Sequence, residues 1–259
     1  MATDKVYRPS TRVPASQGLR ARRLHFDEQL PGAFFPANEL AQMLECNMGP
    51  KLGGHFRYTA GDWTVTTGGT GDTQADAVTS GGGLLITAAS DDNFDTTLDW
   101  TAVATPVSGK RYFLMARIAV SAATGIGFRI GITTGGGAAA LPFGTDYTDQ
   151  VTFSKAITSA NVVGKVRGNS DTAADTGTLG AMANDTEIEI GFEVYVHATT
   201  PAGAWYYNGV RTEFTSAQRD QVALLLTTPA TCYWTLHVTG VTGTNPTLLV
   251  TSLVAGRSK

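Results

Sequence analysis

At 259 residues, of which 42% are hydrophobic and 16% charged, the chain has ample apolar material for a core but little charge for its surface. A net charge of −3 argues against a dedicated nucleic-acid-binding protein, which normally contains a basic domain. The sequence has no apolar leader and no run of about 18 apolar residues, so we expect neither a signal peptide nor a membrane span.

Residues 1–50 differ in composition from the rest and predict an extended arm. They contain five of the ten prolines and a cluster of basic residues with a single acidic neighbour, Asp4. The basic residues are Lys5, Arg8, Arg12, Arg20, Arg22 and Arg23. Such a segment typically becomes ordered against an acidic or phosphate-bearing partner. We therefore expect two parts, an arm at 1–50 and a β-sandwich domain at 51–259.

The arm contains the helix that the sequence predicts, over residues 38–45. Asn38 can cap its N-terminus, and Leu40, Met43 and Leu44 form one apolar stripe at helical spacing. This stripe gives the arm an apolar face in addition to its positive charge.

From residue 54 onward, short β-type runs alternate with clusters of Gly, Asp, Asn and Ser, which is typical of an antiparallel sandwich. Strands are predicted at 63–67, 84–88, 97–101, 112–120, 127–133, 151–157, 162–166, 187–196, 204–207, 210–214, 232–238 and 247–254. Apolar and polar residues alternate over 187–196, which indicates a half-buried strand, whereas 112–120 is apolar on both faces and should be central. Asn208-Gly209 predicts a type I′ hairpin turn.

Cysteine and histidine residues suggest no cofactor. Cys46 and Cys232 are far apart in sequence and have no metal-ligand spacing, so two free thiols are expected, with a long-range disulfide as the alternative. The four histidines are scattered, and His237 lies on a predicted strand, where a hydrogen-bonded structural histidine is the default.

The order of elements resembles concanavalin-like jelly rolls, and in particular the domains of this kind found in structural proteins of tailed bacteriophage particles. The similar runs are 82–87 (GGLLIT), 97–100 (TLDW), 109–118 (GKRYFLMARI), 127–132 (GFRIGI), 205–210 (WYYNGV) and 248–254 (LLVTSLV). They span about residues 80–256 and form a pattern of strands and turns without a catalytic signature.

This resemblance implies a non-enzymatic capsid decoration or cement subunit on the virion surface, with no cofactor and no metal. Its partners would be the major capsid protein and copies of itself, with a trimer favoured. The arm would grip the shell through charge anchors at Arg20, Arg22 and Arg23 and through apolar anchors at Phe34, Phe35, Leu40, Met43 and Leu44.

Two features favour other functions. Asp185, Glu187 and Glu189 alternate as the carboxylates of laminarinase-type glycosidases do, but the order of Asp and Glu differs, and a solvent-facing strand continued by Glu193 is the alternative. Aromatic residues, including Trp63, Trp100, Trp205, Tyr206, Tyr207, Tyr233 and Trp234, could line a sugar groove or pack in the core. The rival prediction is therefore a carbohydrate-binding module or receptor-binding tail-fibre component, with a loop cation held by Asp91, Asp92 and Asp95.

Overall fold

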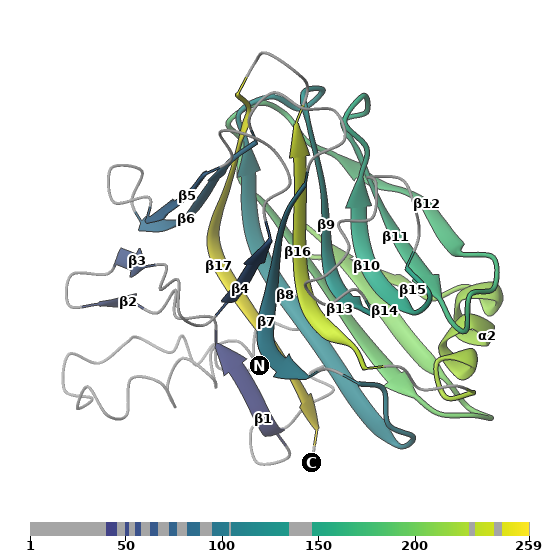
Figure 1. The fold of residues 1–259 in the computed structure, drawn as a ribbon. Helices are drawn as coiled ribbons and strands as arrows, with labels where there is room; N and C mark the ends of the chain where they lie inside the picture. The colour runs from purple at the N-terminus through teal and green to yellow at the C-terminus, as the bar shows by residue number, and fades with distance from the viewer. Residues whose placement is uncertain are drawn as a thin grey trace, which may run out of the picture.

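The computed structural model describes residues 40–45, 50–51, 55–57, 63–66, 73–76, 82–88, 95–103, 105–134, 147–227, 231–240 and 245–258. The strands in these ranges form two sheets, one of ten strands and one of seven, with a hydrophobic core between them (Figure 1). Every pairing of named strands here is antiparallel except that of β3 with β6. The chain is thus the antiparallel jelly-roll sandwich that the sequence predicts.

The ten-stranded sheet has the order β15-β14-β13-β8-β17-β6-β3-β2, with β1 also paired to β17 and β5 to β6. Its strands are β1 (Leu40–Glu45), β2 (Pro50–Lys51), β3 (His55–Arg57), β5 (Thr73–Asp76), β6 (Gly82–Thr87), β8 (Lys110–Val120), β13 (Ile188–Val196), β14 (Ala202–Tyr207), β15 (Val210–Glu213) and β17 (Thr247–Ser258).

The seven-stranded sheet has the order β12-β11-β10-β9-β16-β7-β4. Its strands are β4 (Trp63–Thr66), β7 (Asp95–Val103), β9 (Ile126–Thr133), β10 (Gln150–Lys155), β11 (Asn161–Arg167), β12 (Ala174–Ala181) and β16 (Tyr233–Gly240). Strands β5 and β12 were not predicted, because the Asp and Ala residues of both, together with the Gly residues of β12, lower their β-propensity. Pairing along one edge is enough to hold them in the sheets.

Strand β8 lies between β13 and β17, which confirms the central position predicted from its apolar character. Its even-numbered side chains from Tyr112 to Val120 belong to the core, and Phe113 and Met115 on the other face are also buried. A strand with two buried faces needs apolar residues at successive positions, and this is why its sequence does not alternate.

The predicted helix at 38–45 is wrong over residues 40–45, which form strand β1. This strand pairs with β17, with Leu44 opposite Ala255 and Glu45 opposite Val254. An isolated helix of this length is marginal in water, whereas the edge of β17 offers a row of backbone hydrogen-bond partners. The long-range pairing therefore overrides the local helical pattern.

The turn between β14 and β15 confirms the hairpin prediction. Asn208 and Gly209 have φ values of 48° and 78°, so both residues lie in the left-handed region that a type I′ turn requires. Asn208 Oδ1 also accepts a hydrogen bond of 2.8 Å from the backbone N–H of Glu189, which ties the turn to β13.

Helix α2 (Ser216–Leu224) follows β15 and was missed, although its sequence contains a capping box. Thr215 Oγ1 accepts a hydrogen bond of 3.2 Å from the backbone N–H of Gln218, and Gln218 Oε1 accepts one of 3.1 Å from that of Thr215. A Thr followed three residues later by Gln is the usual sequence signal for such a start. Figure 1 shows α2 at one end of the sandwich, beside β11 and β12.

Replacing Thr215 with alanine should lower the free energy of unfolding by about 1 kcal/mol, because the cap to the Gln218 N–H is lost. Urea denaturation followed by circular dichroism measures the change. Thr215→Ser keeps the hydroxyl, so it should lower the free energy of unfolding by only a few tenths of that amount. An equal loss in both variants would show that the methyl group, and not the cap, contributes the stability.

The core is rich in aromatic rings at the end that α2 covers. The ring of Trp205 meets that of Phe153 at 5.0 Å and that of Phe214 at 4.9 Å between centroids. Phe192 lies 5.9 Å from Trp205 and 6.3 Å from Trp234. Trp205 and Trp234 are therefore core residues, which confirms core packing for this part of the aromatic set.

Candidate functional site

The predicted arm contacts fall mostly outside the described residues. Arg20, Arg22, Arg23, Phe34 and Phe35 lie there. The remaining apolar anchors, Leu40, Met43 and Leu44, are in β1, where the backbone pairs with β17. The grip of the arm on a capsid, the capsid and self-association partners, and the virion location stay predictions.

The three alternating carboxylates do not share one strand face. Strand β13 begins at Ile188, and Asp185 precedes it in a turn with a φ of 52°. Glu187 accepts a hydrogen bond of 2.6 Å from Thr251 Oγ1. Glu189 is on the strand and pairs with Arg117 Nε at 3.1 Å. This arrangement differs from the regular array that a glycosidase of the laminarinase kind would need.

Glu193 was expected on a solvent-facing strand face, and this is wrong, because its side chain is only 1% exposed. Its Oε1 accepts hydrogen bonds of 2.7 Å from Tyr206 Oη and 3.1 Å from Arg211 Nη2. Burial raises the pKa of Glu193 above its ordinary value, although both bonds act to lower it. Glu193 and Tyr206, both buried, thus form a polar cluster with the more exposed Arg211 across β13, β14 and β15.

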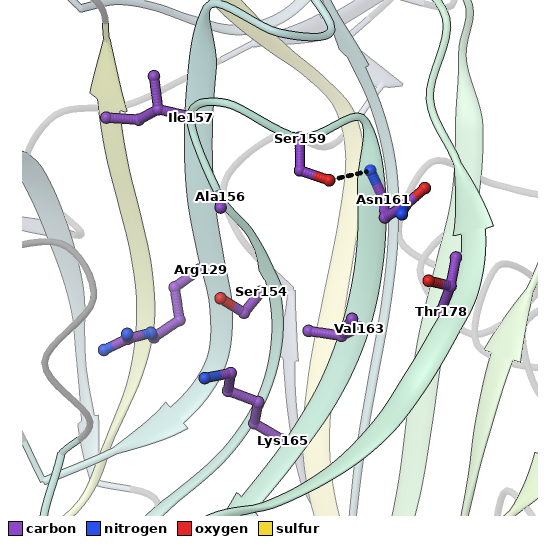
Figure 2. Close-up of a pocket in the computed structure, with 9 residues that line it drawn as sticks. All are labelled: Arg129, Ser154, Ala156, Ile157, Ser159, Asn161, Val163, Lys165 and Thr178. Carbon is purple, nitrogen blue, oxygen red and sulfur yellow. Dashed lines mark hydrogen bonds between the residues drawn. The ribbon is translucent and has the colours of Figure 1, made fainter.

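A pocket of about 440 Å³ opens on the seven-stranded sheet, on the face turned away from the core; we call it the β9–β12 pocket. Its floor is a row of residues from four adjacent strands. Ser154 of β10 lies opposite Arg129 of β9 on one side and Val163 of β11 on the other, and Val163 lies opposite Thr178 of β12. Figure 2 shows this row running across the sheet.

The two ends of the β9–β12 pocket differ in chemistry. At one end, the turn joining β10 to β11 contributes Ile157, Ser159 and Asn161. The Ser159 hydroxyl accepts a hydrogen bond of 3.1 Å from the backbone N–H of Asn161, which fixes this turn. At the other end lies Lys165, two residues beyond Val163 on β11 (Figure 2). The pocket therefore has a neutral polar end and a cationic end.

The charged residues of the β9–β12 pocket are held by their neighbours. Arg129 is only 1% exposed, and its guanidinium lies 5.0 Å over the ring of Tyr147, a favourable cation–π distance. Lys165 Nζ lies 3.7 Å from Asp175 Oδ2, in a pair whose side chains are 21% and 48% exposed. Exposed pairs of this kind contribute little energy, so the pair costs little to rearrange around a ligand.

The other candidate groups from the sequence are the two cysteines, His237 and the acidic loop. Cys232 is a free, buried thiol whose pKa is raised to about 12 by burial, whereas Cys46 lies outside the described residues. His237 is buried on β16 with Nδ1 3.5 Å from Tyr147 Oη, the structural role expected for it. Among the described residues no group of three or more His, Cys, Asp or Glu side chains could hold a metal ion. Of the predicted cation loop, Asp91 and Asp92 lie outside the described residues, and Asp95 is the first residue of β7.

The aromatic sugar groove expected as an alternative is not formed by the aromatic residues of β14 and β16. Trp205 and Trp234 are in the core, and Tyr206 is buried beside Glu193. In the described part of the chain, the residues that line the β9–β12 pocket include no aromatic side chain. Any ligand there would be held by hydrogen bonds and charge in place of ring stacking.

Sequence reasoning did not single out the residues of the β9–β12 pocket. The alternation in β11, in which Val163 and Lys165 are half-buried between buried neighbours, does indicate that they share a face. Nothing in the local pattern indicates that Arg129 and Thr178 lie in the same row, because strand order is set by long-range pairing.

Within the described residues, no helix has the length and apolar character needed to cross a bilayer.

The sequence matches no protein-family model and no curated protein sequence. Its fold, however, resembles that of many solved structures. An endo-β-1,4-glucuronan lyase from the fungus Trichoderma reesei superposes with a TM-score of 0.55 at 12% identity, over 84% of this chain and 95% of the lyase. The Emp47p carbohydrate recognition domain superposes with a TM-score of 0.55 at 7% sequence identity, over 86% of this chain and 98% of that domain. An endo-1,3-β-glucanase from Streptomyces sioyaensis superposes with a TM-score of 0.52 at 15% sequence identity, over 83% of this chain and 95% of the glucanase.

These similarities show the fold. The β-sandwich that these structures share with this chain agrees with the concanavalin-like jelly-roll architecture expected from the sequence. Two of the three structures are enzymes and the third is a recognition domain, so the shared fold leaves open which kind of protein this is. The decision rests on the residues of the site.

Proposed function

We propose that this protein is a non-catalytic carbohydrate-binding module that holds a saccharide in the β9–β12 pocket. The observation that supports the proposal is the composition of this pocket, in which hydroxyl, amide and cationic groups from four strands surround an open volume of about 440 Å³. That volume is within the range of roughly 300–1,000 Å³ typical of small-molecule sites. Saccharides expose many hydroxyl groups, which such donors and acceptors can bind.

Binding is favoured over hydrolysis because of where the carboxylates lie. Glycosidases generally need two carboxylates flanking the scissile bond. The lining residues of the β9–β12 pocket that the structure describes include no Asp and no Glu. The candidate carboxylate Glu189 belongs to β13 in the other sheet and is paired with Arg117. The fold shared with a carbohydrate recognition domain is consistent with a binding role.

Replacing Asn161 with alanine and Thr178 with valine together should weaken saccharide binding about tenfold. Each change removes hydrogen-bonding groups from the β9–β12 pocket, and one net hydrogen bond contributes about 0.5–1.5 kcal/mol. Binding is measured by isothermal titration calorimetry, after a glycan array has identified a ligand for the full chain.

Thr212→Val is the matched control, because Thr212 is an exposed threonine on β15, the edge strand of the other sheet, just as Thr178 is on β12. This control variant should bind the saccharide like the wild type. Absence of any ligand on the array, or equal affinities for the double variant and the wild type, would overturn the proposed function or its site.

A further inference from the structure

We infer that the β9–β12 pocket selects saccharides that bear a carboxylate, such as chains of uronic acids, over their neutral counterparts. This inference rests on the proposed function and names the substrate class of the same site. It depends on the sign, position and burial of the charged residues that line the pocket.

Among the described residues, the charged side chains that line the β9–β12 pocket are those of Arg129 and Lys165, and both are cations. They come from β9 and β11, the two strands that flank β10. Figure 2 shows the ammonium group of Lys165 near Ser154, whereas the guanidinium of Arg129 is directed away from Ser154. An anionic group bound beside Ser154 would therefore be near the positive charge of Lys165, whereas a neutral hydroxymethyl group there would gain only hydrogen bonds.

Asp175 does not remove the positive charge from the pocket. It lies opposite Lys165 on β12, with Oδ2 3.7 Å from Nζ, which is longer than a hydrogen bond. An ammonium group has three donors, so Lys165 can bind a ligand carboxylate and remain close to Asp175. Asp175 is not among the described lining residues, of which two are cations and none is an anion.

The two cations would have different roles. Lys165 is half-buried and flexible, so its ammonium group can contact the ligand directly. Arg129 is buried with its guanidinium over the ring of Tyr147, so it is less accessible to a ligand than Lys165. Lys165 is therefore the direct contact, and the preference for a carboxylate rests on it.

The opposite end of the pocket sets the direction of the ligand. Ser159 and Asn161 lie at the β10–β11 turn, and the exposed Asn161 amide can both donate to and accept from sugar hydroxyls. A saccharide would thus place its carboxylate toward Lys165 and its neutral hydroxyl groups toward this turn. Such a division selects for a carboxylate at one ring position, not for negative charge in general.

The test compares two β-1,4-linked trisaccharides that differ only at C6, one made of glucose and one of glucuronic acid. Calorimetric titration of the full chain at low salt should give a dissociation constant at least about tenfold lower for the acidic trisaccharide. Lys165→Gln should remove most of this preference, and Lys165→Arg should retain it. Raising the salt concentration from 20 to 300 mM should weaken binding of the acidic trisaccharide more than binding of the neutral one.

Lys110→Gln is the matched control, because Lys110 is a half-buried lysine at the start of β8 in the other sheet, and its variant should keep the preference. Thermal unfolding verifies that each variant is folded. Equal binding of the two trisaccharides, or a preference that Lys165→Gln leaves intact, would overturn the inference while leaving carbohydrate binding in place. Failure of both these and all arrayed glycans to bind would overturn the proposed function as well.

Discussion

Replacing Trp205 with alanine is expected to lower the free energy of unfolding by about 3–5 kcal/mol, the usual range for removing a buried tryptophan from a core. Trp205 is fully buried and contacts the rings of Phe153, Phe192 and Phe214. Its Nε1 also donates a hydrogen bond of 3.4 Å to Gln218 Oε1, which links the ring to α2. The substitution therefore leaves a large cavity between the two sheets and removes a contact of the helix.

The surroundings of Trp205 leave little room for relaxation into that cavity. A Cβ atom built on Gly164 would lie 2.5 Å from the indole ring, so the backbone of β11 already packs directly against it. Urea denaturation at neutral pH measures the loss, and Trp205→Phe should lose clearly less because a phenyl ring fills part of the volume. A loss below about 1 kcal/mol for Trp205→Ala would contradict this description of the core.

The second large effect concerns Arg211. Replacing Arg211 with methionine should lower the free energy of unfolding by about 2 kcal/mol at pH 8, because the buried Glu193 carboxylate loses its charged hydrogen-bond donor. This loss is smaller than the roughly 3–5 kcal/mol for breaking a fully buried ion pair, because Arg211 itself is 31% exposed and water can partly replace it. Tyr206 would still donate its hydrogen bond to Glu193.

The pH dependence of this loss follows from the pKa of Glu193. The pKa is raised in the folded protein by burial, so ionisation of Glu193 makes folding less favourable as the pH rises through that value. Without Arg211, whose charge and hydrogen bond lower it, the pKa of Glu193 in the folded protein should rise further. The difference in stability between wild type and Arg211→Met should therefore be small near pH 4, where Glu193 is protonated in both, and should grow toward pH 8.

The control combines Arg211→Met with Glu193→Gln, since no buried carboxylate is then left to ionise. The effect of adding Arg211→Met to Glu193→Gln should depend only weakly on pH, because the other carboxylate paired with Arg211, that of Glu213, is exposed and such pairs contribute little. Urea denaturation at pH 4, 6 and 8 can verify this. An equal loss for the single Arg211→Met variant at all three pH values would mean that Arg211 stabilises the fold through packing alone.

Local sequence patterns predicted most of the sandwich because they report on physics that acts within a few residues. Twelve strand predictions correspond to observed strands, and the turn at Asn208-Gly209 was predicted because both of its residues tolerate positive φ. The helix α2 could also have been predicted, since Thr215 and Gln218 form its capping box without help from the rest of the fold.

By contrast, residues 40–45 form a strand because β17 provides backbone partners more than 200 positions later in the chain. The burial of Glu193 likewise depends on Tyr206 and Arg211 from neighbouring strands. Alternation along a strand shows which residues share a face, but it contains no information on which strands will be neighbours.

The sequence by itself therefore determined the class of fold, the position of the central strand β8 and the tight hairpin, because propensity, alternation and turn geometry are local properties. The tertiary structure alone decided the β9–β12 pocket. Arg129, Ser154, Val163 and Thr178 are contributed by four strands, and only the register of three antiparallel pairings brings them into one row. That register is set by packing of the core faces of the same strands, so the candidate site is a consequence of how the opposite face is buried.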